Sequence, residues 1–185
     1  LKAVPIADAG STVKATTTFT NGSPQPVQDI AVALAAPDGW TATADTPDVF
    51  GEVAPGQSVT TTWSVTVPDG AAPAGLALGA TVTTPGGSYT AQAPVTVPYA
   101  SVSAAFDNSG ISDDADTKTG SIDAEGASFS LQALAALGWK AGQSTDHDGV
   151  SFPWPATAGT GKPDNVVAGG QAVRITGTGG KLGFV

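Results

Sequence analysis

Acidic side chains crowd one segment of this sequence, from Phe106 to Phe129. The segment contains a single basic residue, Lys118, and glycines at positions 110, 120 and 126 interrupt it. Neither a helical nor a strand period of apolar residues survives there, so the sequence predicts a loop. The six carboxylates of the loop are Asp107, Asp113, Asp114, Asp116, Asp123 and Glu125.

Loops rich in carboxylate and carbonyl oxygens suit Ca²⁺, which makes this loop a candidate metal site. Its spacing does not fit the EF-hand template, because Lys118 stands where that template has Asp or Asn. Two interpretations stay open, a structural Ca²⁺ and a solvated acidic loop, and no cofactor is required. The candidate ligands are Asp113, Asp114, Asp116, Asp123 and Glu125.

The sequence offers no recognisable catalytic arrangement. His147 is its sole histidine and lies between Asp146 and Asp148 in a turn, where a solvated loop residue is expected. No serine occupies a G-x-S-x-G elbow. The carboxylates that could hydrolyse a glycosidic bond lie on loops, without an aromatic platform to raise the pKa of one of them. We therefore expect no catalysis from this chain, and we expect Asp164-Asn165 to bond its own backbone in a turn.

Two tryptophans are candidates for carbohydrate binding. An exposed indole can stack beneath a sugar ring when a few polar groups orient the sugar. Trp154 stands between Pro153 and Pro155, which excludes a central strand, and Trp139 follows Gly138, a helix-ending residue. For both tryptophans, packing in the core is the alternative.

Composition narrows the class of partner. The 185 residues carry 7 Lys or Arg and 16 Asp or Glu, with a net charge of −9. So few scattered basic residues cannot neutralise phosphates, which excludes nucleic acid and disfavours an anionic membrane surface as partners. The absence of cysteine excludes thiol catalysis and cysteine-type zinc sites. No apolar run is long enough to predict membrane insertion.

Residues 1–98 have the pattern of an all-β domain. Short runs of alternating apolar and polar residues are bounded by Pro, Gly or Asp, at the spacing of an immunoglobulin-like sandwich. Trp40 and Trp63 are its predicted aromatic core residues. The predicted strands are Lys2 to Ile6, Val13 to Thr20, Ile30 to Leu34, Trp40 to Ala44, Ser58 to Val67, Leu76 to Thr83 and Tyr89 to Val97.

Three motifs in this half carry a family resemblance. An Asn21-Gly22 turn follows the first long strand, P-x-G-W ends at Trp40, and P-G-Q-S-V-T-x-x-W-x-V-x-V-P begins at Pro55. With these motifs, residues 10–98 resemble the immunoglobulin-like domain found beside the catalytic domains of α-galactosidases and other secreted glycosidases, often next to NPCBM-type carbohydrate-binding modules. The resemblance implies a spacer or docking module and transfers no catalytic residue.

Residues 99–185 follow the break at Pro98 and are predicted to form a second domain. Ser130 is the expected N-cap of one short helix, Leu131 to Leu137, and Gly138 is its expected C′ residue. The predicted strands are Ser101 to Phe106, Val150 to Trp154 and Ala172 to Thr176, and an apolar stretch from Leu182 to Val185 ends the sequence.

Five motifs give this half its own resemblance. They are FDNxGISDD from Phe106, S-F-S-x-x-A-L-A-A-x-G from Ser128, DGVxFxWP from Asp148, PDNVVAxGQ from Pro163, and a terminal G-x-K-L-G-F. In this order they resemble an accessory domain of actinobacterial-type secreted glycoside hydrolases. The resemblance implies the N-terminal part of a galactose-binding-like or jelly-roll β-sandwich, with a carbohydrate-associated function.

The sequence therefore predicts an all-β chain, with an immunoglobulin-like sandwich at 1–98 and a partial carbohydrate-associated sandwich with one short helix at 99–185. We expect a non-catalytic accessory region of a secreted, extracellular glycoside hydrolase, which spaces or docks the catalytic domain, with carbohydrate as a candidate ligand. The alternative is a purely structural or adhesive surface module. Because a jelly roll needs about eight strands and residues 99–185 supply only about four, we expect the remainder of the parent enzyme, as a second chain or segment, to complete the second sandwich.

Overall fold

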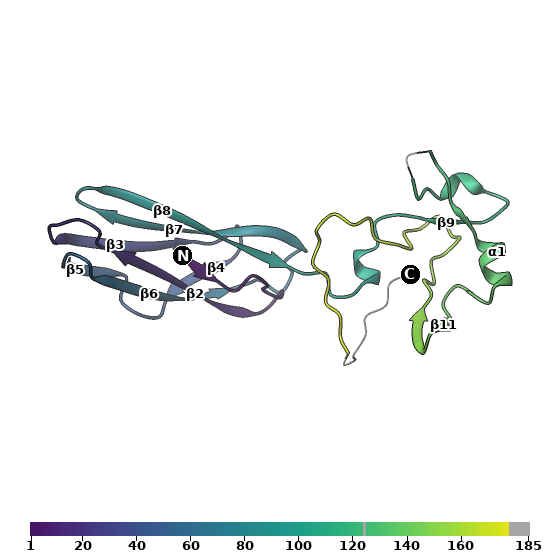
Figure 1. The fold of residues 1–185 in the computed structure, drawn as a ribbon, viewed down its shortest axis with the longest axis horizontal. Helices are drawn as coiled ribbons and strands as arrows, with labels where there is room; N and C mark the ends of the chain where they lie inside the picture. The colour runs from purple at the N-terminus through teal and green to yellow at the C-terminus, as the bar shows by residue number, and fades with distance from the viewer. Residues whose placement is uncertain (124, 178–185) are drawn as a thin grey trace. The chain divides into compact units, whose positions relative to one another are not determined.

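The protein is described by a computed structural model that covers residues 1–123 and 125–177. The chain divides into two compact units, Leu1–Pro98 and Tyr99–Val185, each with its own elements (Figure 1). Strands dominate and one short helix is present in the described residues, so the predicted all-β class is confirmed.

Two antiparallel sheets make up the first unit, all of whose residues are described (Figure 1). Alternation of apolar and polar residues along each strand turns one face of each sheet inward, as a sandwich requires. One sheet has the order β1 (Lys2–Ala3), β2 (Thr12–Thr20), β6 (Ser58–Thr66) and β4 (Thr41–Ala44). The other has the order β5 (Val49–Val53), β3 (Val27–Ala35), β7 (Ala74–Thr84) and β8 (Gly87–Val97).

The core of this unit lies between the two sheets. Ile30, Val65 and Leu78 are fully buried there, from three different strands. Trp63 is 5% exposed, and its indole Nε1–H donates to the Thr17 hydroxyl at 3.2 Å. Trp40 is half-buried and packs against the same core. Both tryptophans are therefore core residues, as the sequence predicts, although Trp40 lies at the margin.

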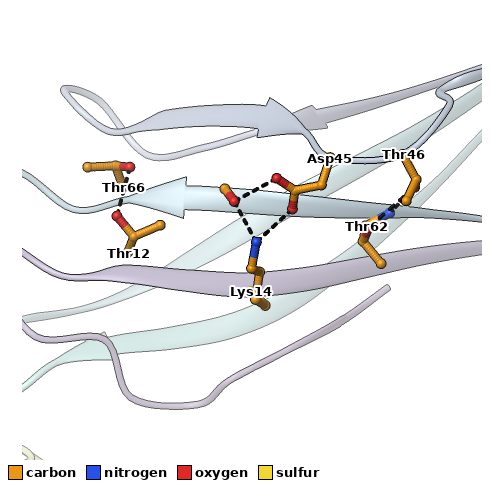
Figure 2. Close-up of polar contacts among 7 residues, drawn as sticks. Thr12, Lys14, Asp45, Thr46, Thr62 and Thr66 are labelled. Atoms are coloured by element: carbon orange, nitrogen blue, oxygen red, sulfur yellow. Dashed lines mark hydrogen bonds and ion pairs between the residues drawn. The ribbon is translucent and has the colours of Figure 1, made fainter.

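The outer face of the sheet that contains β2 and β6 is polar. The Thr12 and Thr66 hydroxyls pair across the two strands at 3.1 Å. Lys14 donates to Asp45 at 2.9 Å and to the Ser64 hydroxyl at 2.7 Å (Figure 2). The hydrogen bond from Lys14 lowers the pKa of the Asp45 carboxyl below its usual value, and the bond from Ser64 acts in the same direction.

The connection from β2 to β3 passes from one sheet to the other, and Asn21 holds it in place. Asn21 is 1% exposed. Its Nδ2 donates to the backbone carbonyls of Gln25 at 2.8 Å and Val53 at 2.9 Å, while its Oδ1 accepts the Ser23 N–H. The sequence signals a turn at Asn21-Gly22; the structure adds that the Asn21 amide ties this connection to the end of β5.

The structure of the first unit differs from the prediction in one missed strand and one divided strand. β5 (Val49–Val53) is missing from the predicted strands, because Gly51 interrupts its apolar pattern, and it pairs with β3. The predicted strand from Lys2 to Ile6 is divided at Pro5, where the chain moves from one sheet to the other. Lys2 and Ala3 pair with β2, whereas Ile6 bridges Thr96 at the edge of β8. Proline has no N–H with which to continue the first ladder.

Short elements make up the described part of the second unit. They are η1 (Ser103–Ala105), β9 (Ile111–Ser112), η2 (Thr117–Thr119), β10 (Phe129–Ser130), α1 (Leu131–Ala136), β11 (Ser144–His147) and β12 (Val150–Pro153). β9 and β10 are parallel neighbours, and β11 and β12 form an antiparallel hairpin. The Ser130 hydroxyl accepts the Ala133 N–H at 3.0 Å, and Gly138 has φ 91°, so both predicted ends of the helix are confirmed.

Two predicted strands of the second unit are wrong. The stretch from Ser101 to Phe106 contains a 3₁₀ turn, Ser103–Ala105, because the Ser101 hydroxyl accepts the Ala104 N–H at 3.1 Å and favours a turn over a strand. The stretch from Ala172 to Thr176 forms one isolated bridge, Val173 to Tyr99, and no ladder. The predicted apolar stretch from Leu182 to Val185 lies outside the described residues.

Candidate functional site

A buried carboxylate joins two distant motifs of the second unit. Asp164 is 3% exposed. Its Oδ1 accepts the Gly110 N–H at 2.8 Å, and its Oδ2 accepts the Ile111 N–H at 3.1 Å. The prediction that Asp164 bonds its own backbone in a turn is therefore wrong. A carboxylate that binds two backbone N–H groups satisfies both donors and keeps its own charge hydrogen-bonded when buried.

Backbone hydrogen bonds strengthen the same junction. The Asn108 carbonyl accepts the N–H groups of Asp164 at 2.8 Å and Asn165 at 3.1 Å, and the Asn165 carbonyl accepts those of Asp107 and Asn108. The Asn108 Nδ2 also donates to Asn165 Oδ1 at 3.1 Å. A Cβ at Gly110 would lie 2.9 Å from Ile122 Cγ2, so a side chain at that position requires a shift. We call this junction of Asp107-Asn108 with Asp164-Asn165 the Asp-Asn clasp.

An apolar groove of about 470 Å³ lies beside the Asp-Asn clasp. Phe129 is 56% exposed in it, and Val102 and Ile122 are also exposed. The lining includes Val102, Phe106, Ile122, Phe129, Trp154 and Pro155. Sequence reasoning did not identify Phe106 and Phe129 as site residues, although these two aromatic residues bracket the acidic segment and could have signalled a shared site.

The structure brings Trp139 and Trp154 together but does not place both in the groove. Their ring centroids are 5.1 Å apart, with the planes tilted by 52°. Trp154 lines the groove, whereas Trp139 packs against it and is not part of the lining. The Trp154 backbone N–H donates to the Gln143 carbonyl at 2.7 Å, which extends the β11–β12 hairpin. Trp139 therefore supports the position of the Trp154 indole.

The five candidate calcium ligands do not converge. Asp113 Oδ1 accepts the Ala115 N–H at 2.8 Å, and its Oδ2 accepts from Gln132 Nε2 at 3.0 Å. Asp123 Oδ1 accepts the N–H groups of Glu125 at 3.0 Å and Ala127 at 2.9 Å. Within residues 1–123 and 125–177, no three acidic or histidine side chains are grouped so that they could hold a metal ion.

The remaining candidates, Asp114, Asp116 and Glu125, are exposed, and the calcium site stays a prediction.

His147 is the last residue of β11, and its Nε2 atom lies 3.7 Å from Asp148 Oδ2. Both side chains are largely exposed, as expected of a solvated turn residue. None of the helices in the part of the chain that the structure describes is long and apolar enough to cross a membrane.

A known protein family matches part of the first unit. Residues 7–84 match the family described as NPCBM-associated, NEW3 domain of alpha-galactosidase. The first unit is thus similar to an accessory domain. The predicted resemblance of this half is confirmed, and the match supports a non-catalytic accessory role for it. No curated protein matches the chain.

Three solved structures match about half of this chain. The secreted serine protease VesC from Vibrio cholerae is 14% identical over 53% of this chain and 22% of its own, with a TM-score of 0.41. The GAE domain of GGA2p from Saccharomyces cerevisiae is 15% identical over 52% of this chain and 85% of its own, with a TM-score of 0.35. A family 123 glycoside hydrolase from Clostridium perfringens is 16% identical over 50% of this chain and 22% of its own, with a TM-score of 0.36.

Proposed function

We propose that this chain is a non-catalytic accessory region of a secreted, extracellular glycoside hydrolase, in which it spaces or docks the catalytic domain. The observation that carries the proposal is the match of residues 7–84 to the NEW3 domain of alpha-galactosidase. The first unit has the properties of a spacer, because its core lies between two sheets and the outer face of one of them is lined by paired hydroxyls.

Docking is the role we propose for the apolar surface of the second unit. Its large exposed apolar side chains are Val102, Ile122, Phe129, Leu137, Val167 and Ile175, whereas the buried apolar residues among its described positions are Ala105, Ile111 and Ala158. Large apolar side chains thus lie mostly on the surface of this unit and small ones in its interior, so we propose that a partner covers them. In this proposal the remainder of the parent enzyme, as a second chain or segment, covers that surface and completes the second sandwich.

Light scattering tests the docking role on the isolated chain. We expect self-association or binding of an apolar dye, because the exposed side chains have no cover. A monodisperse 18.0 kDa monomer whose second unit melts cooperatively and binds no dye would contradict the proposal.

The proposed function also includes carbohydrate binding by the second unit. An indole that lines an apolar groove, with a second indole packed against it, offers a surface on which a sugar ring can stack. We propose that Trp154 makes this contact and that Trp139 positions it. The alternative, a purely structural or adhesive module, predicts no contact with sugars.

Affinity electrophoresis in gels that contain soluble polysaccharides separates the two roles. We expect at least one polysaccharide to retard the full chain, and Trp154→Ala to abolish the retardation. Tyr89→Ala is the control, because it removes an aromatic side chain that is 58% exposed and lies in the other unit. If no polysaccharide retards the chain, or if both variants behave alike, Trp154 is not a sugar platform and the structural role remains.

A further inference from the structure

Asn21 and Gly22 form the one Asn-Gly pair of the sequence, whereas the other two asparagines, Asn108 and Asn165, are followed by Ser and Val. Asparagine is a chemically labile residue when a protein is heated or aged. In an unfolded chain it is most labile before glycine, because glycine has no Cβ to hinder its own nitrogen. The pair is therefore a place where the backbone can react with a side chain, unless the fold prevents it.

The reaction is deamidation, and its only co-reactant is water. The Gly22 nitrogen attacks Asn21 Cγ and forms a five-membered succinimide ring. The Cγ–Nδ2 bond breaks, and Nδ2 leaves as ammonia with the proton of the Gly22 N–H. Water then adds to one of the two ring carbonyls and opens the ring to Asp or to isoaspartate. Nothing is oxidised or reduced.

Four hydrogen bonds hold the Asn21 side chain away from this reaction. Nδ2 donates both of its hydrogens, to the carbonyls of Gln25 at 2.8 Å and Val53 at 2.9 Å. Oδ1 accepts from the Ser23 N–H at 2.9 Å and from the Ser23 hydroxyl at 2.8 Å. An amide has two donor hydrogens and two acceptor lone pairs, so all of its sites are used. The amide must give up these bonds before it can turn Cγ toward Gly22.

The backbone of Asn21 is held as well. Its N–H donates to the Gln57 carbonyl at 2.9 Å, and its carbonyl accepts the Gly56 N–H at 2.7 Å. The residue is 1% exposed, so the water that opens the ring is also kept out. Ring closure and ring opening therefore both require that this part of the structure opens first.

We infer that Asn21-Gly22 is a modification site that reacts only when the connection from β2 to β3 opens, so that its deamidation records unfolding of the first unit. The amide is bound to two separate segments, because Gln25 belongs to the connection and Val53 ends β5. Its release therefore requires the end of β5 to separate from the connection. No disulfide limits such opening, since the chain has no cysteine.

Either product opposes return to the original fold. Asp at position 21 has no hydrogen to donate to the Gln25 and Val53 carbonyls, and its charge would be buried against them. Isoaspartate adds one carbon to the backbone, which displaces the groups that bond Gly56 and Gln57. The lifetime of the first unit is then set by the rate of a chemical change after opening.

Peptide mapping by mass spectrometry tests the inference on the full chain. The chain is incubated in mildly alkaline buffer, with and without urea that unfolds the first unit, and the deamidated fraction at Asn21 is followed with time. We expect deamidation in urea to be at least about a hundredfold faster, because in buffer only the rare open molecules react. In urea, Asn108 and Asn165 should deamidate more slowly than Asn21, since their next residues have a Cβ.

Gly22→Ala is the matched control. The φ of Gly22 lies outside the left-handed region, and a Cβ there would meet no other described atom within 4 Å, so the fold accepts alanine. We expect this variant to deamidate several-fold more slowly in urea, because the added methyl group hinders the attacking nitrogen. Ser23→Ala removes a hydroxyl that binds both Asn21 and Gln25, so it should speed deamidation in buffer and leave the rate in urea unchanged.

Equal rates in buffer and in urea would overturn the inference, since the fold would then give no protection. An unchanged rate for Gly22→Ala in urea would exclude ring closure at this pair. Removal of urea from the deamidated chain completes the test. We expect it to refold with a lower urea midpoint than the unmodified chain, and an equal midpoint would show that the modification leaves no record in the fold. These readouts involve no sugar and no partner, so a failure here is distinct from a failure of the proposed function.

Discussion

Replacing Asp164 by Asn tests whether the buried carboxylate holds the Asp-Asn clasp together. The carboxylate accepts one N–H on each oxygen, at 2.8 Å from Gly110 and 3.1 Å from Ile111. An amide of the same size keeps one acceptor and turns an N–H donor toward the other N–H group. One hydrogen bond to a charged group is lost, worth about 1.5–3 kcal/mol, and one buried N–H is left unsatisfied, at a cost of about 1–3 kcal/mol.

These two contributions overlap, so we expect Asp164→Asn to lower the free energy of unfolding of the second unit by about 2–4 kcal/mol. Urea titration followed by hydrogen-exchange mass spectrometry reads the two units separately, whereas fluorescence would mix tryptophans from both. Asp114→Asn is the matched control, because that carboxylate is exposed and accepts no hydrogen bond within the described residues. We expect the control to stay within about 0.5 kcal/mol.

The reasoning would be refuted by equal effects of the two substitutions on the second unit. Unchanged exchange of the Gly110 and Ile111 amides in Asp164→Asn would refute it as well, since these are the two N–H groups that the carboxylate accepts.

Three further predictions concern other polar groups. Asn21→Asp removes both hydrogen bonds that the buried amide donates, so the first unit should lose about 2–4 kcal/mol, seen as a lower urea midpoint; an unchanged midpoint would mean that these bonds contribute nothing. The Asp45 carboxyl, followed by the NMR shift of its carbon, should titrate with a pKa below the usual value of an aspartate, and Lys14→Met should raise that pKa. Because the pKa of Asp45 is lowered in the folded protein, the stability that the Lys14–Asp45 pair contributes is present above the unfolded pKa and is lost as pH falls through the folded pKa. A difference in stability between the wild-type protein and Lys14→Met that persists at still lower pH would contradict this cause. Chelator and added Ca²⁺ should leave hydrogen exchange in residues 107–123 unchanged, because Asp113 already accepts hydrogen bonds on both oxygens; calcium-dependent protection would instead establish a structural metal.

The helix ends and most strands of the first unit were predictable from the sequence because they depend on residues that are close together along the chain. The N-cap at Ser130 and the left-handed Gly138 depend on a residue and its near neighbours along the chain, so both are readable without a fold. Alternation of apolar and polar residues likewise predicted most strands of the first unit, since the side chain period of a strand is a property of that strand alone. It failed at β5, where Gly51 interrupts the alternation and the pairing with β3 decides the strand.

The sequence by itself determined the all-β class, the helix with its cap, the two core tryptophans and the resemblance of the first half to a glycosidase-associated domain. The tertiary structure decided which side chains meet. Asp164 lies 54 positions from Gly110, and an aspartate in a proline-bounded loop looks the same in the sequence whether it bonds its own turn or a distant backbone. The groove that Trp154 shares with Phe129, and the one that Leu1 shares with Phe19, are likewise products of packing. Such contacts depend on where whole segments come to rest, and no local propensity contains that information.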